Sequence, residues 1–278
     1  MVQLSVFIHH QSPIHVQTNI VHYFILDSLA LHILAPLAMA EELPTFLSFT
    51  ETWHNKPYDY ISPNRPELSM AGKNVVVAGG GSGIGKATAI AFAQAGAASV
   101  SILGRRVERL QDAAEEIRQA GPNTKVITES ADFSKPSAAE AGLESIVQQV
   151  VKIDIFVWSA GIMPQLGEVK GYNVEDLRHG LDLIVVSAFN AIQAVLPRAA
   201  PGLKILHVST GIAHMKPIKG IFNYATTKLA VIKMLDYLAA ENPDLHVVHI
   251  QPGVVESEVN GPTGMAGQDE RKSDHSEM

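Results

Sequence analysis

The chain has 278 residues, of which 46% are apolar and 18% are charged, and this balance is ordinary for a globular protein with one sizeable core. Its 28 acidic and 21 basic residues give a net charge of -7, which argues against a nucleic acid or an anionic membrane as the main partner and favours a small-molecule substrate. The absence of cysteine excludes disulfides, cysteine-based zinc sites and thiol catalysis, and it suits a reducing compartment such as the cytoplasm.

The first part of the chain, residues 1–70, reads as an N-terminal extension that is largely irregular. No lysine or arginine precedes Lys56, so we assign neither a secretory signal nor an arginine-rich transit peptide. The apolar stretch of residues 20–38 is long enough to span a membrane, but it contains Asp27 and two histidines. We therefore expect no membrane partner.

In residues 71–260, strand and helix patterns alternate at the pace of βαβ units, which predicts one dinucleotide-binding domain. Parallel strands joined by right-handed crossovers predict an α/β fold with a doubly wound parallel sheet, a Rossmann fold, whose strands lie in the order 3-2-1-4-5-6. The expected strands are residues 75–77, 99–103, 125–130, 154–158, 203–208 and 245–250, and the expected helices are residues 84–95, 106–120, 136–151, 174–200 and 224–240. The polar, aperiodic residues 261–278 are expected to form a disordered tail.

A glycine-rich turn joins the first expected strand to the first expected helix, in the segment KNVVVAGGGSGIGK of residues 73–86. Its glycines allow positive φ and bring backbone N–H groups close to a ligand, while the helix directs its partly positive N-terminus at the same place. A hairpin or a linker has a similar composition, but the flanking strand and helix favour a dinucleotide site. The residues assigned to this site are Gly79, Ser82, Gly83, Ile84 and Gly85.

Tyr224 and Lys228 stand four residues apart, so on a helix they lie on one face, one turn apart. A lysine ammonium favours the phenolate and lowers the tyrosine pKa from about 10, which makes the hydroxyl a usable acid or base. An ordinary amphipathic pair has the same spacing. Ser209 and Thr210 follow the fifth expected strand, at the sheet edge where open α/β sheets bind ligands.

The glycine spacing G-x-x-x-G-x-G and the position of the Tyr-x-x-x-Lys pair after the fifth strand resemble the short-chain dehydrogenase/reductase family over residues 40–260. The resemblance implies an oxidoreductase. It also favours a catalytic role for the tyrosine–lysine pair over an ordinary amphipathic pattern. It implies that Tyr224 delivers a proton and that Lys228 binds the ribose of the cofactor. Thr210 orients the substrate oxygen in this assignment, and Ser209 is the alternative.

The same resemblance assigns the cofactor-binding residues. Arg105 and Arg106 follow the second strand, and Gly104 stands where an acidic residue would bind the ribose of NAD, so the resemblance favours NADP as the cofactor. The alternative is that the two arginines are a solvated pair at the start of a helix. Asp132 matches the residue that contacts the adenine. The other cofactor contacts that the resemblance implies are Ala160, Gly161, Tyr224, Lys228, Val255 and Ser257.

The chain departs from the family pattern in two places. The family's proton-relay asparagine falls at Ile184, and Asn190 lies too far along the helix to replace it, so protons must reach Lys228 by another route. Family members continue with a substrate-covering helix and a seventh strand, so we expect that strand to be missing, the edge of residues 245–250 to be exposed, and homo-oligomers to form weakly. Residues 1–38 precede a start typical of fungal members and are either an upstream-start product or a native flexible arm.

The sequence thus predicts an NADP-dependent oxidoreductase that interconverts a carbonyl and an alcohol on a small organic substrate, with a secondary metabolite suggested by the fungal resemblance. The alternative is a nucleotide-binding protein with little or no catalysis, either a sensor or a truncated inactive product. The twelve histidines predict no metal site, because isolated histidines are more often packed or surface residues. An apolar substrate pocket is expected to include Met163, Pro164, His214, Met215 and Phe222.

Overall fold

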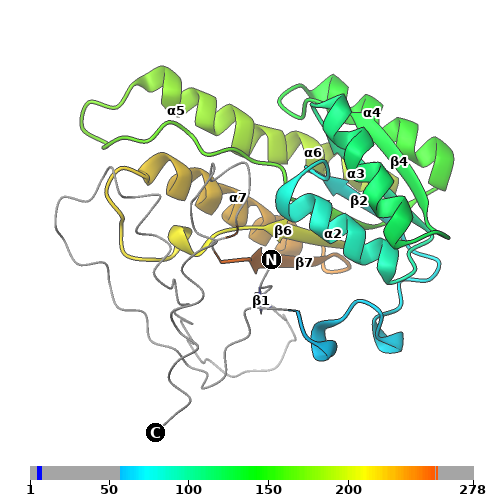
Figure 1. The fold of residues 1–278 in the computed structure, drawn as a ribbon. Coiled ribbons are helices and arrows are strands. Elements are labelled where there is room, and N and C mark those ends of the chain that lie inside the picture. The colour runs from blue at the N-terminus through cyan, green and yellow to red at the C-terminus, as the bar shows by residue number, and fades with distance from the viewer. Residues whose placement is uncertain (1–4, 8–56, 254, 256–278) are drawn as a thin grey trace, which may run out of the picture.

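The computed structural model describes residues 5–7, 57–253 and 255, and within them a central sheet of seven strands lies between layers of helices (Figure 1). The strands run in the order β1-β7-β6-β5-β2-β3-β4, and all neighbours are parallel except β1, which is antiparallel to β7. The six parallel strands therefore have the predicted order 3-2-1-4-5-6, which confirms the doubly wound sheet. The strands are β1 Ser5–Phe7, β2 Asn74–Ala78, β3 Ser99–Gly104, β4 Lys125–Ser130, β5 Ile153–Trp158, β6 Ala199–Val208 and β7 His246–Gln251.

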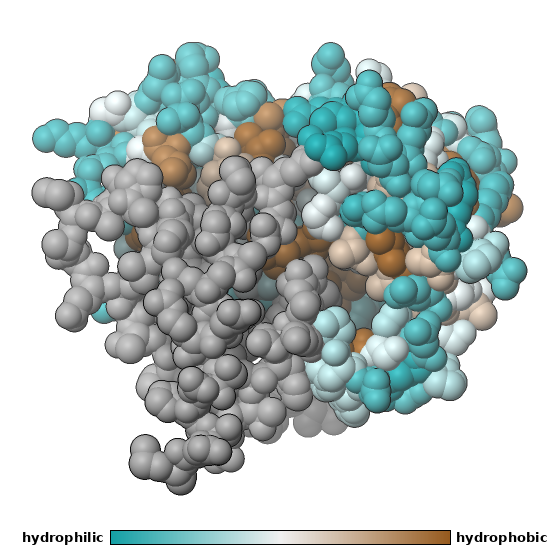
Figure 2. All heavy atoms as spheres, in the orientation of Figure 1, coloured by the Kyte–Doolittle hydropathy of each residue, from teal (hydrophilic) through white to brown (hydrophobic). Residues whose placement is uncertain are grey.

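The helices begin and end where local chemistry favours it. Pro136 occupies the first turn of α4, where its missing N–H costs no hydrogen bond, and Asn173 caps α5 by accepting a hydrogen bond from the Glu175 N–H at 2.8 Å. The main helices are α2 Gly83–Gln94, α3 Val107–Ala120, α4 Pro136–Val150, α5 Val174–Gly180, α6 Ser187–Val195 and α7 Phe222–Glu241, with 3-10 turns at Asp59–Ile61, Pro66–Leu68, Leu196–Arg198 and Gly211–Ala213. On the face drawn in Figure 2, hydrophilic residues cover much of the outer surface of α3 and α4.

The helix expected over residues 174–200 is divided by a π-helical segment, Leu181–Val186, between α5 and α6. The hydroxyl of Ser187 donates to the Asp182 carbonyl oxygen at 3.0 Å, five residues earlier, as the wider turn of a π-helix permits. Residues 174–198 together are long and apolar enough to cross a membrane. Half of their most apolar window is nevertheless buried inside the protein, which is typical of a core helix.

The end of this helix also differs from the expectation. Residues 196–198 form a 3-10 turn, and β6 already begins at Ala199 rather than at Leu203. Ala199 pairs with Ile153 across a register irregularity. The strand therefore starts before the apolar residues 203–208 from which it was predicted.

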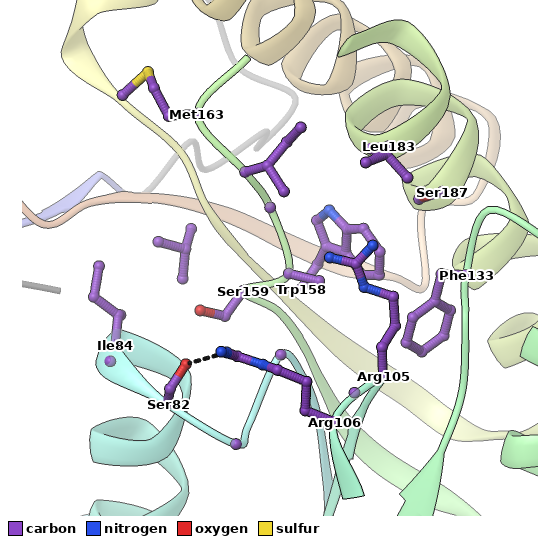
Figure 3. Close-up of a pocket in the computed structure, with 18 of the residues that line it drawn as sticks. Ser82, Ile84, Arg105, Arg106, Phe133, Trp158, Ser159, Met163, Leu183 and Ser187 are labelled. Atoms are coloured by element: carbon purple, nitrogen blue, oxygen red, sulfur yellow. Dashed lines mark hydrogen bonds between the residues drawn. The ribbon is translucent and has the colours of Figure 1, made fainter. Parts of the chain in front are cut away.

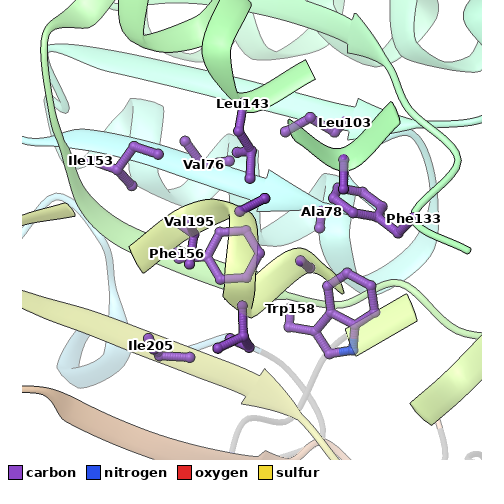
Figure 4. Close-up of a cluster of buried hydrophobic side chains, with 14 of the residues drawn as sticks. Val76, Ala78, Leu103, Phe133, Leu143, Ile153, Phe156, Trp158, Val195 and Ile205 are labelled. Atoms are coloured by element: carbon purple, nitrogen blue, oxygen red, sulfur yellow. The ribbon is translucent and has the colours of Figure 1, made fainter. Parts of the chain in front are cut away.

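Two apolar cores lie on opposite faces of the sheet, because successive side chains of β2 point to opposite sides. Val76 packs toward α4, α6 and α7, whereas Val75 and Val77 pack toward α2 and α3. Figure 4 shows the larger core, in which Trp158 meets Phe133 edge-on with 5.2 Å between ring centroids. Aromatic packing of this kind holds the carboxyl end of β5 in a fixed position.

The edge of β7 is not open along its whole length. In β1, Ser5 lies opposite Gln251 and Phe7 lies opposite His249, so the expectation of an exposed edge is wrong for the last three residues of β7. A strand of three residues is too short to produce a periodic pattern, and its partner lies at the far end of the chain. The rest of the extension before residue 57, and the tail of residues 261–278, lie outside the described residues.

Candidate active site

A cleft of about 510 Å³ opens at the carboxyl ends of the parallel strands (Figure 3). The turn after β2, the start of α3, the loops after β5 and β6, and the first turns of α7 all contribute to its walls. The residues assigned from the sequence that line it are Gly79, Ser82, Gly83, Ile84, Arg105, Arg106, Asp132, Ala160, Gly161, Ser209, Thr210, Tyr224, Lys228 and Val255. Gly85 is buried and does not line the cleft, and Ser257 lies outside the described residues.

The glycine turn leaves room for a ligand because side chains do not fit there. Gly79 has a φ of 82°, and a Cβ on it would lie 2.7 Å from the backbone nitrogen of Ala160. A Cβ on Gly85 would lie 2.2 Å from the carbonyl oxygen of Gly79, so this glycine allows α2 to approach the turn. The cradle beside the N-terminus of α2 therefore fits a diphosphate, as a dinucleotide site requires.

Three arginines gather where β3 meets α3. Arg106 donates a hydrogen bond to the Ser82 hydroxyl at 3.4 Å, and Arg105 extends into the cleft in a different direction (Figure 3). Arg109 also lines the cleft, and the sequence analysis missed it. Its spacing of three residues from Arg106, the first residue of the expected helix, was the available signal, since residues so spaced on a helix share a face.

Asp132 lines the same part of the cleft as Arg105. Hydrogen bonds from the Ser134 hydroxyl at 2.7 Å and from the Ser134 N–H at 3.1 Å lower the pKa of this carboxyl, and the charges of Lys135 and Arg105 lower it further. The carboxylate is thus ionised near neutral pH and held by its own turn, where it can accept a hydrogen bond from a ligand.

Tyr224 and Thr210 are joined by a hydrogen bond between their side chains. Burial raises the pKa of the Tyr224 phenol, and the hydrogen bond with Thr210 offsets this rise only in part. The expectation that Lys228 lowers the tyrosine pKa is therefore wrong in this structure, where the lysine Nζ lies 5.9 Å from the centroid of the tyrosine ring. Ser209 has a buried hydroxyl that meets no hydrogen-bond partner within the described residues, so Thr210 is the residue that contacts the tyrosine.

Lys228 lies almost completely buried on α7. Its Nζ donates a hydrogen bond to the carbonyl oxygen of Val208 at 3.1 Å, at the end of β6. Burial removes water from the ammonium and lowers its pKa to about 8. A lysine with this pKa is partly in its neutral form near neutral pH, unlike an exposed lysine.

Ile184, which the sequence analysis assigned to the position of the family's relay asparagine, lies in the core rather than in the cleft. Ile184 has a relative exposure of 1% and belongs to the larger apolar cluster, whereas its neighbours Leu183 and Ser187 line the cleft. Of the residues expected to form an apolar substrate pocket, Met163 lines the cleft. The aromatic walls formed by Phe133 and Trp158 were not expected from the sequence.

A sequence profile described as "short chain dehydrogenase" matches residues 73–266. The chain belongs to the short chain dehydrogenase family. A short chain dehydrogenase from Pseudocercospora fijiensis is 31% identical to it over 226 residues, which cover 78% of this chain and 71% of that protein.

Two solved structures of dehydrogenases resemble this short chain dehydrogenase in fold. A short chain dehydrogenase from Burkholderia cenocepacia in complex with NADP has a TM-score of 0.58 and 28% identity, over 64% of this chain and 71% of that one. An NAD+-bound xylitol dehydrogenase also has a TM-score of 0.58, with 25% identity over 62% of this chain and 65% of that one.

Proposed function

We propose that this short chain dehydrogenase is an NADP-dependent oxidoreductase that interconverts a carbonyl and an alcohol on a small organic substrate, a secondary metabolite in view of its fungal relatives. The observation that carries the proposal is one cleft that holds the hydrogen-bonded pair Tyr224 and Thr210, the buried Lys228 and the three arginines. Family membership supports an oxidoreductase, and these residues support the finer assignment.

The residues present fit the nicotinamide cofactor, which supplies or accepts a hydride when bound. The bare cradle at Gly79 suits its diphosphate, and Arg105 and Arg106 suit a 2′-phosphate because guanidinium groups bind phosphate in a bidentate manner. Asp132 lies where an adenine is expected.

In the direction of reduction, Tyr224 holds the proton that the substrate oxygen receives. Its raised pKa keeps the phenol protonated until a partner carrying developing negative charge draws the proton away. The hydroxyl of Thr210 fixes the orientation of the phenol and stands ready to bind the same substrate oxygen. Lys228, with a pKa of about 8, can donate or accept a proton behind the tyrosine near neutral pH.

Tyr224→Phe tests the proposed reaction. We expect it to abolish the oxidation of NADPH by any ketone or quinone that the wild type reduces, because phenylalanine keeps the ring and loses the proton. Tyr237→Phe is the matched control, since Tyr237 lies on the same helix with a relative exposure of 64%. Wild-type turnover by Tyr224→Phe on a true substrate would refute the mechanism.

The choice of cofactor has its own test. Charge-assisted hydrogen bonds contribute about 1.5–3 kcal/mol each, so one contact between a guanidinium and the 2′-phosphate implies at least about a tenfold preference for NADPH over NADH. Titration of both nucleotides, followed by the intrinsic tryptophan fluorescence to which Trp158 in the cleft wall contributes, measures this ratio. We expect Arg105→Ala and Arg106→Ala to reduce the preference and Arg118→Ala, an exposed arginine on α3, to retain it. Equal affinities of the wild type for both nucleotides would contradict the assignment.

The alternative is a nucleotide-binding protein with little or no catalysis. It is favoured by one observation, the buried Ile184 at the position of the relay asparagine. Binding of NADPH with no turnover across the ketone and quinone screen would support this alternative over the enzyme.

A further inference from the structure

A chain of three titratable side chains lies beside α7, outside the contacts described above. His207 on β6 and His249 on β7 are opposite each other in the parallel pairing, and their Nδ1 atoms are 3.0 Å apart. The Nε2 of His249 lies 3.4 Å from the Oδ1 of Asp236 on α7. One Nδ1 of the pair must donate and the other accept, so the protonation of each ring determines that of its neighbour.

The three side chains run from the surface to the interior. The side chain of Asp236 has a relative exposure of 41% and that of His249 of 19%, whereas His207 is completely buried. Within the described residues, the Nε2 of His207 has no hydrogen-bond partner. A buried polar atom in this situation costs free energy, so it needs either water or a functional reason.

The inner end of the chain lies next to Lys228. The Nζ of Lys228 donates to the carbonyl oxygen of Val208, the residue that directly follows His207. The imidazole of His207 has a pKa well below its usual value because of burial first, and then because of the charges of Lys228 and His249. The lysine charge therefore acts on the buried imidazole.

Other charged groups near this chain are few within the described residues. On α7, Lys233 forms an ion pair with the other carboxylate oxygen of Asp236 at 3.2 Å, which keeps that carboxylate anchored at the surface. The strand beyond β7 is β1, and its residues Ser5–Phe7 are not titratable. On the opposite side, β5 pairs Trp158 with His207. Lys228, whose Nζ is hydrogen-bonded to the residue after His207, is the charged group that these contacts place at the inner end of the chain.

We propose that Asp236, His249 and His207 form a proton path between solvent and Lys228, which replaces the route that Ile184 has closed. The use of this path in turnover rests on the proposed function, but its existence does not. His207 and His249 act through Lys228, so they position and supply the proton without touching the substrate.

In the proposed relay, one proton enters at His249 for each proton that leaves His207, and both rings stay neutral. For inward transfer, His249 accepts a proton at Nε2 from the side of Asp236 and releases the proton on Nδ1 to the Nδ1 of His207. His207 then releases the proton on its Nε2, through a bridging water, to the neutral amine of Lys228. Both rings end as the opposite tautomer, and rotation of the rings or transfer in the opposite direction restores the starting state.

The test measures proton exchange at Lys228 and needs neither cofactor nor substrate. In full-length protein labelled with 15N-lysine, the NMR signal of the buried Nζ is identified by its loss in Lys228→Met, and its exchange with water is measured below the pKa of about 8. We expect His207→Asn and His249→Gln to slow this exchange at least about tenfold, which corresponds to about 1.4 kcal/mol in the barrier. Asp236→Asn keeps the outer end polar and uncharged, and it should slow exchange as well.

His246→Gln is the matched control, because His246 lies on the same strand and is exposed. We expect it to exchange at the wild-type rate. Unchanged or faster exchange in both His207→Asn and His249→Gln would overturn the proton path, whether or not the protein proves to be an oxidoreductase. Slower exchange in a protein that turns over no carbonyl would instead support the path and count against the proposed function.

Discussion

Replacement of Lys228 by methionine should make the protein more stable at neutral pH. The pKa of this lysine falls from 10.5 to about 8 on folding, so the unfolded chain binds the proton more tightly than the folded protein does. A shift of this size corresponds to roughly 3 kcal/mol at pH 7, at about 1.4 kcal/mol per pKa unit. The penalty is fully present below about pH 8 and disappears as the pH rises toward 10.5, where the unfolded chain also loses the proton.

The assay is urea denaturation of wild type and Lys228→Met at several pH values. We expect the variant to be more stable by up to about 3 kcal/mol near pH 7, less the lost hydrogen bond to Val208, and this advantage to shrink by about 2 kcal/mol by about pH 9.5. Lys204→Met, which removes an exposed lysine from β6, is the control and should follow the wild type. A difference between wild type and Lys228→Met that does not change with pH would refute the reasoning.

Three further predictions follow from local geometry. Thr210→Val should raise the pKa of Tyr224 further, because the hydrogen bond that it removes lowers this pKa. A phenolate absorbance titration, with Tyr224→Phe as the reference, measures the change, and an unchanged pKa would count against the contact. Gly79→Ala should weaken NADPH binding and destabilise the fold by about 1–3 kcal/mol, more than Gly96→Ala, which has a similar φ of 79° but nothing within 4 Å of its Cβ. Deletion of residues 2–38 removes β1 and should increase light scattering from aggregates, because it leaves the edge of β7 unpaired. A monodisperse deletion variant would show that pairing with β1 is not needed to prevent aggregation.

Much of the sheet could be predicted because its strands are short apolar runs bounded by glycine, proline and polar residues. The run Val75–Val77 lies inside β2, and residues 125–130 form β4 with the predicted bounds. Parallel strands buried on both faces leave little choice of register or order once the crossovers are right-handed. The π-helical segment before Ser187 was not predictable in this way, because an apolar helix face shows the same pattern with or without one extra residue in a turn.

The candidate site followed from motifs at strand ends, and all of its predicted residues except Gly85 and the undescribed Ser257 line one cleft, although their roles stay predictions. The pKa of Tyr224 was predicted in the wrong direction, because the spacing of the two residues shows a neighbouring lysine but not the depth of burial. The contact between His207 and His249 was also invisible, since it depends on the register between two strands that are 42 residues apart at that point. Such contacts between distant segments are what a single sequence carries least clearly.

The pairing of β1 with β7 has a consequence for the order in which the protein is made. Ser5 leaves the ribosome well before Gln251, its partner in the sheet, because the two residues lie far apart along the chain. Contacts of such long sequence separation form late, because the entropy of loop closure must be overcome first. The segment that forms β1 therefore has no partner in the sheet until β7 has been synthesised, and this edge of the sheet is completed late in folding.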